Sequence, residues 1–107
     1  MGQSGTTASG KLRLSIAISD YDHVRDLTEG RVRAEGIELI PLNFSVEEIF
    51  YRFVSFVEWD VSELSMAKYV SLISQDQREI TAIPVFPSRV FRHSAFFVSP
   101  DSEVKTL

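Results

Sequence analysis

The chain has 107 residues, a formal net charge of −4 and no cysteine. This length suits one small domain, and the lack of thiols excludes a disulfide framework and thiolate metal sites. The negative charge argues against a nucleic-acid partner, because phosphate contacts need a basic surface. No stretch approaches the ~20 apolar residues of a membrane span, so no membrane partner is expected.

The first eleven residues are rich in Gly, Ser and Thr and lack the apolar core of a secretory signal. We therefore expect a disordered leader over residues 1–11 and an α/β unit over residues 12–107. A chain without cysteine and without a signal fits the cytoplasm. A periplasmic location after removal of a signal stays open.

Residues 12–19 alternate between apolar and polar side chains, which predicts a strand. Asp22 is expected to cap a short helix that ends near Gly30. A second strand is predicted over residues 37–44. Pro41 lies inside it and cannot donate a ladder hydrogen bond, so this strand is expected at a sheet edge.

Ser45 and Glu48 form a capping-box pattern ahead of a helix predicted to end at about residue 57. A short strand is predicted over residues 60–64. Ser65 then has the position of an N-cap for the next helix. The apolar face of that helix is predicted to consist of Met66, Tyr69, Val70 and Ile73.

Two further strands are predicted over residues 79–86 and 94–99. Strands and helices thus alternate, which predicts an α/β fold with three layers and a mainly parallel sheet. Ligands of such folds bind beyond the carboxyl ends of the strands. Three predicted loops lie there, at residues 20–23, 64–66 and 87–93.

The third loop carries the densest anion-binding chemistry of the chain, in Ser88, Arg89, Arg92 and His93. The two arginines can hold carboxylates by bidentate hydrogen bonds, and the Ser88 hydroxyl adds a donor beside them. His93 can donate a proton or hydrogen-bond a ligand. The structural alternatives are arginines that are solvated or paired with acidic residues, and a histidine that only hydrogen-bonds its own fold.

The other two loops offer further candidates. Asp20, Asp22 and His23 carry groups that can bind a divalent metal, but their short spacing matches no recognised ligand pattern and favours turn formation and helix capping. Asp20 and Tyr21, just past the first strand, are better candidates for direct ligand contact. Ser65 can offer its hydroxyl and a helix N-terminus to an anion, or act only as a cap. Without a Gly-rich phosphate loop or a metal pattern, we expect no cofactor and no metal.

Several segments together resemble 4,5-dihydroxyphthalate decarboxylase. They are Ser19-Asp20-Tyr21-Asp22, Gly30-Arg31-Val32-Arg33-Ala34-Glu35-Gly36-Ile37, Val46-Glu47-Glu48-Ile49-Phe50 with Phe53, Asp60-Val61-Ser62-Glu63-Leu64-Ser65, and Ile83-Pro84-Val85-Phe86-Pro87-Ser88-Arg89 with Phe91-Arg92-His93-Ser94. The resemblance covers nearly all of residues 12–107. The last segment is its most specific part.

The resemblance implies part of lobe one of a type 2 periplasmic-binding-protein fold, with non-oxidative loss of CO2 from an aromatic ortho-dicarboxylate that carries two ring hydroxyls. In the roles that we assign on this basis, Arg89 and Arg92 anchor carboxylates, Asp20 and Tyr21 meet the hydroxyls, and His93 delivers the proton. His93 and Asp20 are the candidate catalytic residues.

The family's members are several times longer than this chain, so we expect a fragment that has apolar faces left exposed, poor solubility and possible homo-oligomers. A second function stays open on the same fold. This alternative is a binding protein for a small organic anion that serves an ABC-type transporter.

Overall fold

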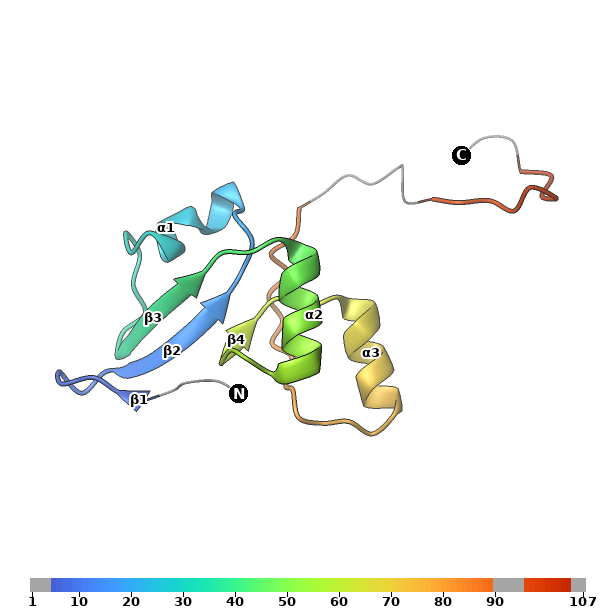
Figure 1. Cartoon of the computed structure of the whole chain (residues 1–107). Coiled ribbons are helices and arrows are strands. Elements are labelled where there is room, and N and C mark those ends of the chain that lie inside the picture. Colours follow the sequence, from blue (N-terminus) through green and yellow to red (C-terminus); the bar gives the residue numbers. More distant parts are fainter. Residues whose placement is uncertain (1–4, 90–95, 105–107) are drawn as a thin grey trace.

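The computed structural model describes residues 5–89 and 96–104. These residues form an α/β unit in which helices pack against a mixed sheet of four strands (Figure 1). The strands are β1 (Gly5–Thr6), β2 (Leu12–Ala17), β3 (Ile37–Leu42) and β4 (Val61–Ser62). The helices are the 3-10 turn η1 (Asp22–Val24), α1 (Arg25–Thr28), α2 (Val46–Phe56) and α3 (Met66–Ser74).

Strand β2 lies at the centre of the sheet. It runs parallel to β3 along its whole length, with Leu12 opposite Ile37, and parallel to β4 at its end, with Ile16 opposite Val61. The prediction of a mainly parallel α/β sheet is therefore confirmed. Within the described residues β3 pairs only with β2, so the edge position predicted from Pro41 is also correct.

Residues 5–11 differ from the expected disordered leader. Gly5 and Thr6 pair antiparallel with β2. The connecting turn is closed by hydrogen bonds from the Thr7 N–H to the Lys11 carbonyl (2.8 Å) and from the Gly10 N–H to the Thr7 carbonyl (2.9 Å). Gly10 has a φ of 81°, which a residue without a Cβ adopts at no steric cost. This local turn chemistry turns the segment back onto β2.

The core lies between β2 and α2. Its buried side chains are Ala17 on β2, Ile49 and Phe53 on α2, and Trp59. Ser45 caps α2 as predicted, because its hydroxyl accepts a hydrogen bond from the Glu48 N–H (3.3 Å). The cap and the apolar stripe together fix α2 over the sheet.

Two predicted capping contacts are not formed. The Glu48 carboxylate accepts a hydrogen bond from Arg52 (3.0 Å), which lies on the next turn of α2. Asp22 begins η1, and the residue before that turn makes no side-chain cap hydrogen bond. The Asp22 carboxylate lies near His23 instead, at 3.4 Å. The Arg52 guanidinium attracts the Glu48 carboxylate more strongly than a neutral amide does.

Helix α3 begins where Ser65 predicted it, since the Ser65 hydroxyl accepts from the Lys68 N–H (3.4 Å). Its predicted apolar face is only half correct. Tyr69 and Ile73 are partly buried, whereas Met66 and Val70 are 56% and 58% exposed. The helix is therefore rotated so that only part of the predicted apolar face is covered.

The two strands predicted nearest the carboxyl terminus are not observed. Residues 79–86 contain no strand, and neither do residues 96–99, the described part of the segment predicted over 94–99. A strand needs a partner for its ladder hydrogen bonds, and neither segment pairs within the part of the chain that the structure describes. Both segments therefore have the apolar pattern of a strand but do not pair with a neighbouring strand among the described residues.

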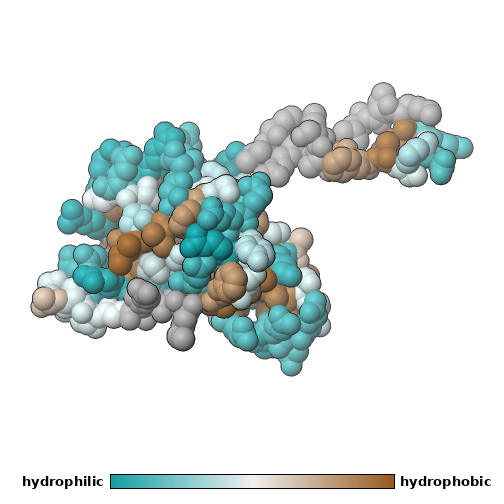
Figure 2. All heavy atoms as spheres, in the orientation of Figure 1, coloured by the Kyte–Doolittle hydropathy of each residue, from teal (hydrophilic) through white to brown (hydrophobic). Residues whose placement is uncertain are grey.

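Many apolar side chains consequently reach the surface. Figure 2 shows them as brown areas between polar ones over the body of the molecule. They include Ile40 on β3, Tyr51 and Phe56 on α2, and Ile83 and Val85 beyond α3. Within the described residues, no helix has the length and apolar character needed to cross a membrane.

Candidate functional site

The carboxyl ends of the three parallel strands lie at one edge of the sheet, and polar residues follow each of them. Ser19 follows β2, and its hydroxyl donates to the Phe44 carbonyl beyond β3 (3.1 Å). Glu63 follows β4, and its N–H donates to the Ala17 carbonyl (3.1 Å), which continues the ladder between β2 and β4. Loops that are distant in the sequence therefore meet here, as the alternating pattern predicted.

Four side chains gather at this edge: Ser19, Tyr21, Glu63 and Ser88, which we call the Tyr21 cluster. The Glu63 carboxylate joins two members, because one oxygen accepts from the Ser19 N–H (2.7 Å) and the other from the Tyr21 hydroxyl (2.7 Å). All members except the exposed Ser88 are partly buried.

The electrostatic environment keeps the Tyr21 phenol protonated. Burial raises the pKa of Tyr21, and the Glu63 carboxylate raises that pKa further, since it accepts the phenol proton and its charge opposes a phenolate. The hydroxyls of Ser88 and Ser19 lower the pKa of Tyr21 to a smaller extent. These influences place Ser88, from the third predicted loop, close to Tyr21 from the first.

Two of the four candidates in the third loop lie within the described residues. Ser88 interacts with Tyr21 as described above. Arg89 is exposed and forms no ion pair with another described residue. Arg92 and His93 lie outside the described residues. The predicted meeting of the first and third loops is thus observed as far as Ser88.

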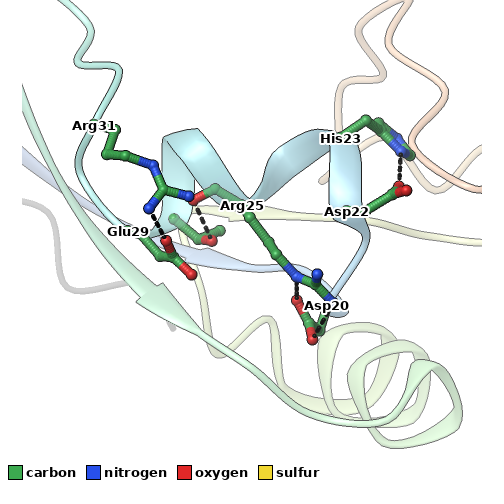
Figure 3. A network of polar contacts seen from close by, with 7 residues as sticks. Asp20, Asp22, His23, Arg25, Glu29 and Arg31 are labelled. Carbon is green, nitrogen blue, oxygen red and sulfur yellow. Dashed lines mark hydrogen bonds and ion pairs between the residues drawn. The ribbon is translucent and has the colours of Figure 1, made fainter.

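Asp20 is held by an arginine of the neighbouring helix α1. Arg25 donates two hydrogen bonds to its carboxylate, at 2.8 and 3.0 Å (Figure 3). The pKa of Asp20 is lowered, chiefly by this hydrogen-bonded contact with Arg25. The lowered pKa makes Asp20 a weaker base, so its carboxylate is suited to accept hydrogen bonds rather than to take up or donate a proton.

The remaining polar residues of this region form contacts within their own segment. His23 stacks on Tyr21 with ring centroids 5.6 Å apart, and its Nδ1 lies 3.4 Å from the Asp22 carboxylate. Arg31 pairs with Asp26 (2.7 Å) and with Glu29 (2.6 Å). In Figure 3 the Arg31–Glu29 pair and the His23–Asp22 pair lie at opposite ends of this helical segment, and the Arg25–Asp20 pair lies between them.

No metal centre is formed by the described residues. Among residues 5–89 and 96–104, no group of three His, Asp or Glu side chains is placed to hold an ion. Asp20, which we considered together with Asp22 and His23 for such a site, is instead occupied by Arg25.

Ser65 is two residues beyond Glu63 and acts as the N-cap of α3. The structural role predicted for it is therefore confirmed, whereas its contact with an anion stays a prediction. Ser65 is partly buried and Ser88 is exposed. Ser65 lies at the start of α3, just after β4, whereas Ser88 is connected to this edge through its interaction with Tyr21.

Glu63 is the residue that sequence reasoning missed as a member of the site. It lies 42 residues from Tyr21 and 44 from Ser19 in the sequence, so no local spacing connects them. One signal was available, because Glu63 lies near the end of the strand predicted over residues 60–64, beside the Ser65 cap, and is therefore expected near the carboxyl-end edge. Only the fold shows that the Glu63 carboxylate accepts hydrogen bonds from the Ser19 N–H and the Tyr21 hydroxyl.

The chain is similar in sequence to two known enzymes. It is 38% identical over 96 residues to 4,5-dihydroxyphthalate decarboxylase from Comamonas testosteroni, and 35% identical over 96 residues to 4,5-dihydroxyphthalate decarboxylase from Pseudomonas putida. Each alignment covers 90% of this chain. The chain spans 29% and 37%, respectively, of the length of these relatives. No protein-family model matches the chain.

Proposed function

We propose that this protein, which is related in sequence to the 4,5-dihydroxyphthalate decarboxylases, takes part in the non-oxidative decarboxylation of a dihydroxylated aromatic ortho-dicarboxylate. The observation that carries the proposal is the similarity to two such enzymes along 90% of the chain. The proposed substrate is 4,5-dihydroxyphthalate, and the products are protocatechuate and CO2.

The reaction sets three demands on a site. The ring carbon that loses CO2 must receive a proton, and a hydroxyl para to it supplies electrons that make this protonation feasible. The site therefore needs a carboxylate anchor, a hydroxyl contact and a proton donor. In this proposal Arg89 and Arg92 provide the anchor, Tyr21 provides the hydroxyl contact, and His93 provides the proton.

The polar edge of the sheet supports part of this assignment. Tyr21 and Ser88 come from different loops and interact there, and the guanidinium of Arg89 follows directly in the sequence. Asp20 takes an accepting role in this proposal, because its contact with Arg25 keeps it ionised. Ser65 lies at the start of α3 as a further hydroxyl for the substrate.

The same relationship supports a fold-level proposal. We infer that the α/β unit described here is part of lobe one of a type 2 periplasmic-binding-protein fold, in which a ligand lies between two lobes. The chain spans about a third of the length of its curated relatives, so the activity belongs to the proposal for the whole protein.

The test is to incubate the complete protein with 4,5-dihydroxyphthalate and to follow CO2 release together with the formation of protocatechuate. Phthalate, which lacks both ring hydroxyls, is the matched control and should give no CO2. Tight binding of 4,5-dihydroxyphthalate without turnover would overturn the proposal in favour of a binding protein for organic anions.

A further inference from the structure

Three hydrogen bonds fix Glu63 at the edge of the sheet. Its own N–H is bound to the Ala17 carbonyl at 3.1 Å. Its two carboxylate oxygens accept from the Ser19 N–H and from the Tyr21 hydroxyl, each at 2.7 Å. Short contacts of this kind to an ionised acceptor are the strong class of hydrogen bond. The orientation of the Tyr21 hydroxyl is therefore determined by Glu63.

The hydroxyl protons of Ser19 and Tyr21, which follow β2, are already donated to acceptors within the protein. Tyr21 donates its single proton to Glu63, and Ser19 donates its hydroxyl proton to the Phe44 carbonyl. Each oxygen keeps lone pairs but has no further proton to give. Towards a ligand, Ser19 and Tyr21 can therefore act only as acceptors.

The negative charge of Glu63 also favours a ligand hydroxyl over a ligand carboxylate. Within the described residues, no Lys, Arg or His forms an ion pair with Glu63. A ligand carboxylate placed beside Glu63 would meet a like charge and the hydroxyl oxygens of Ser19 and Tyr21, whose protons are already donated. The remaining hydroxyl of the cluster, that of Ser88, interacts with the Tyr21 oxygen. A ligand hydroxyl would meet acceptors that match its proton.

We propose that Glu63 is a positioning residue that fixes Tyr21 as a hydrogen-bond acceptor, so that this end of the site selects a phenolic hydroxyl of the ligand and rejects a carboxylate. The inference rests on the proposed function, since it assigns the dihydroxylated end of the substrate to the Tyr21 cluster. The carboxylates are then directed towards Arg89, which follows Ser88 directly in the sequence. The raised pKa of Tyr21 agrees with this role, because a phenol that stays protonated keeps its bond to Glu63.

The test compares the dissociation constants of 4,5-dihydroxyphthalate and phthalate by calorimetry in the complete protein. The wild type should bind the dihydroxylated ligand at least about tenfold more tightly, the difference expected from one good hydrogen bond. Glu63→Gln offers an amide N–H to Tyr21, which frees the Tyr21 proton and reverses its polarity. This variant should lose about tenfold in preference while its affinity for phthalate stays unchanged.

A merely structural role for Glu63 predicts a different result, namely equal weakening of both ligands, and this would overturn the inference. A wild-type protein that does not prefer the hydroxylated ligand would also overturn it. The matched control is Glu35→Gln, because Glu35 is exposed and makes no ion pair with a described residue. It should keep the full preference.

Two further measurements keep the outcomes apart. If Glu63→Gln does not fold, Tyr21→Phe replaces it, since the phenyl ring retains the stack on His23 but has no acceptor oxygen. It should lose the same preference. CO2 release is measured separately. If Glu63→Gln loses the preference and the wild type shows no turnover, the role of Glu63 is supported and the decarboxylase proposal is rejected. If the wild type shows turnover and Glu63→Gln keeps the preference, the decarboxylase proposal is supported and the role of Glu63 is rejected.

Discussion

Ser15 and Asp60 hold β2 and the start of β4 together through three hydrogen bonds. The Asp60 carboxylate accepts from the Ser15 N–H (2.9 Å) and from the Ser15 hydroxyl (3.0 Å), and the same hydroxyl oxygen accepts from the Asp60 N–H (3.0 Å). Ser15 is 8% exposed, the only buried polar residue among those described. This contact fixes the register in which Glu63 reaches Tyr21.

Replacement of this buried hydroxyl should destabilise the fold. Ser15→Ala leaves the Asp60 N–H without its acceptor and removes a donor from the carboxylate, so we expect a loss of about 1–3 kcal/mol in the free energy of unfolding. Urea denaturation followed by circular dichroism measures this change. Ser55→Ala on the exposed side of α2 is the control and should differ from wild type by less than about 0.5 kcal/mol. Equal effects of the two changes would contradict the role of the contact.

The ion pair of Asp20 with Arg25 makes the stability of the fold depend on pH. Its pKa is lower in the folded chain than the ordinary aspartate value because Arg25 binds the ionised form. Such a group stabilises the fold above its unfolded pKa, about 3.9, and this contribution is lost as the pH falls through the folded pKa. Arg25→Gln should therefore raise the pKa of Asp20 towards the ordinary value.

Carboxyl chemical shifts measured by NMR across a pH titration follow this change directly. Arg78→Gln is the control, because Arg78 forms the same kind of exposed pair with Asp76 (2.8 Å) in another part of the chain. It should leave the Asp20 titration unchanged. If the pKa of Asp20 were the same with and without Arg25, the ion pair would not be what keeps Asp20 ionised.

At the level of elements, α2 and α3 differ in how much of the fold depends on them. Ile49 on α2 is 0% exposed within the core, whereas Val70 on α3 is 58% exposed. Ile49→Ala should cost about 2–5 kcal/mol, from lost transfer free energy and the cavity that remains. Val70→Ala should cost less than about 0.5 kcal/mol. Thermal unfolding of both variants checks the contrast, and a large loss for Val70→Ala would mean that this face of α3 is covered in solution.

The elements could be predicted wherever their signals are local. Ser45 and Ser65 mark helix starts through hydrogen bonds that span three residues, and the alternation of residues 12–19 is visible in the sequence itself. The predictions failed where a distant partner decides. Residues 79–86 have the composition of a strand, but a ladder needs a neighbour, and none is present within the described residues.

The same reason explains why a second residue, outside the candidate site, was missed. Arg52 was not singled out from the sequence, yet its guanidinium lies 4.6 Å from the ring centre of Phe44 and 5.1 Å from that of Trp59. It also donates to both oxygens of the Glu58 carboxylate, at 2.7 and 2.8 Å. Like Glu63, Arg52 acquires its role from residues that meet only after folding, so spacing in the sequence gives no sign of it.

For the molecule as a whole, the balance between covered and exposed apolar surface is the dominant property. The core contains few fully buried side chains, whereas 14 large apolar residues are exposed among those described. Ile83, Val85 and Phe86 are all at least 60% exposed and lie within one segment that has a strand-like sequence. Contiguous apolar surface of this kind favours contact with other chains, and a segment with unpaired backbone groups can add to a sheet.

We therefore expect the 107-residue chain to associate as its concentration rises. Sedimentation velocity from about 10 µM to about 1 mM, the range in which exposed apolar surface drives association, should give a mass that increases above the 12.1 kDa of one chain. Val85→Lys places a charge in the strand-like segment and should weaken this association, because an unpaired edge that carries lysine resists pairing. Val32→Lys is the matched control, since Val32 is 57% exposed and Val85 65% but Val32 lies outside the segment. A constant mass of 12.1 kDa over the whole range would show that the exposed apolar residues drive no self-association. Equal effects of the two lysine variants would show that the added charge, and not its place in the strand-like segment, controls the association.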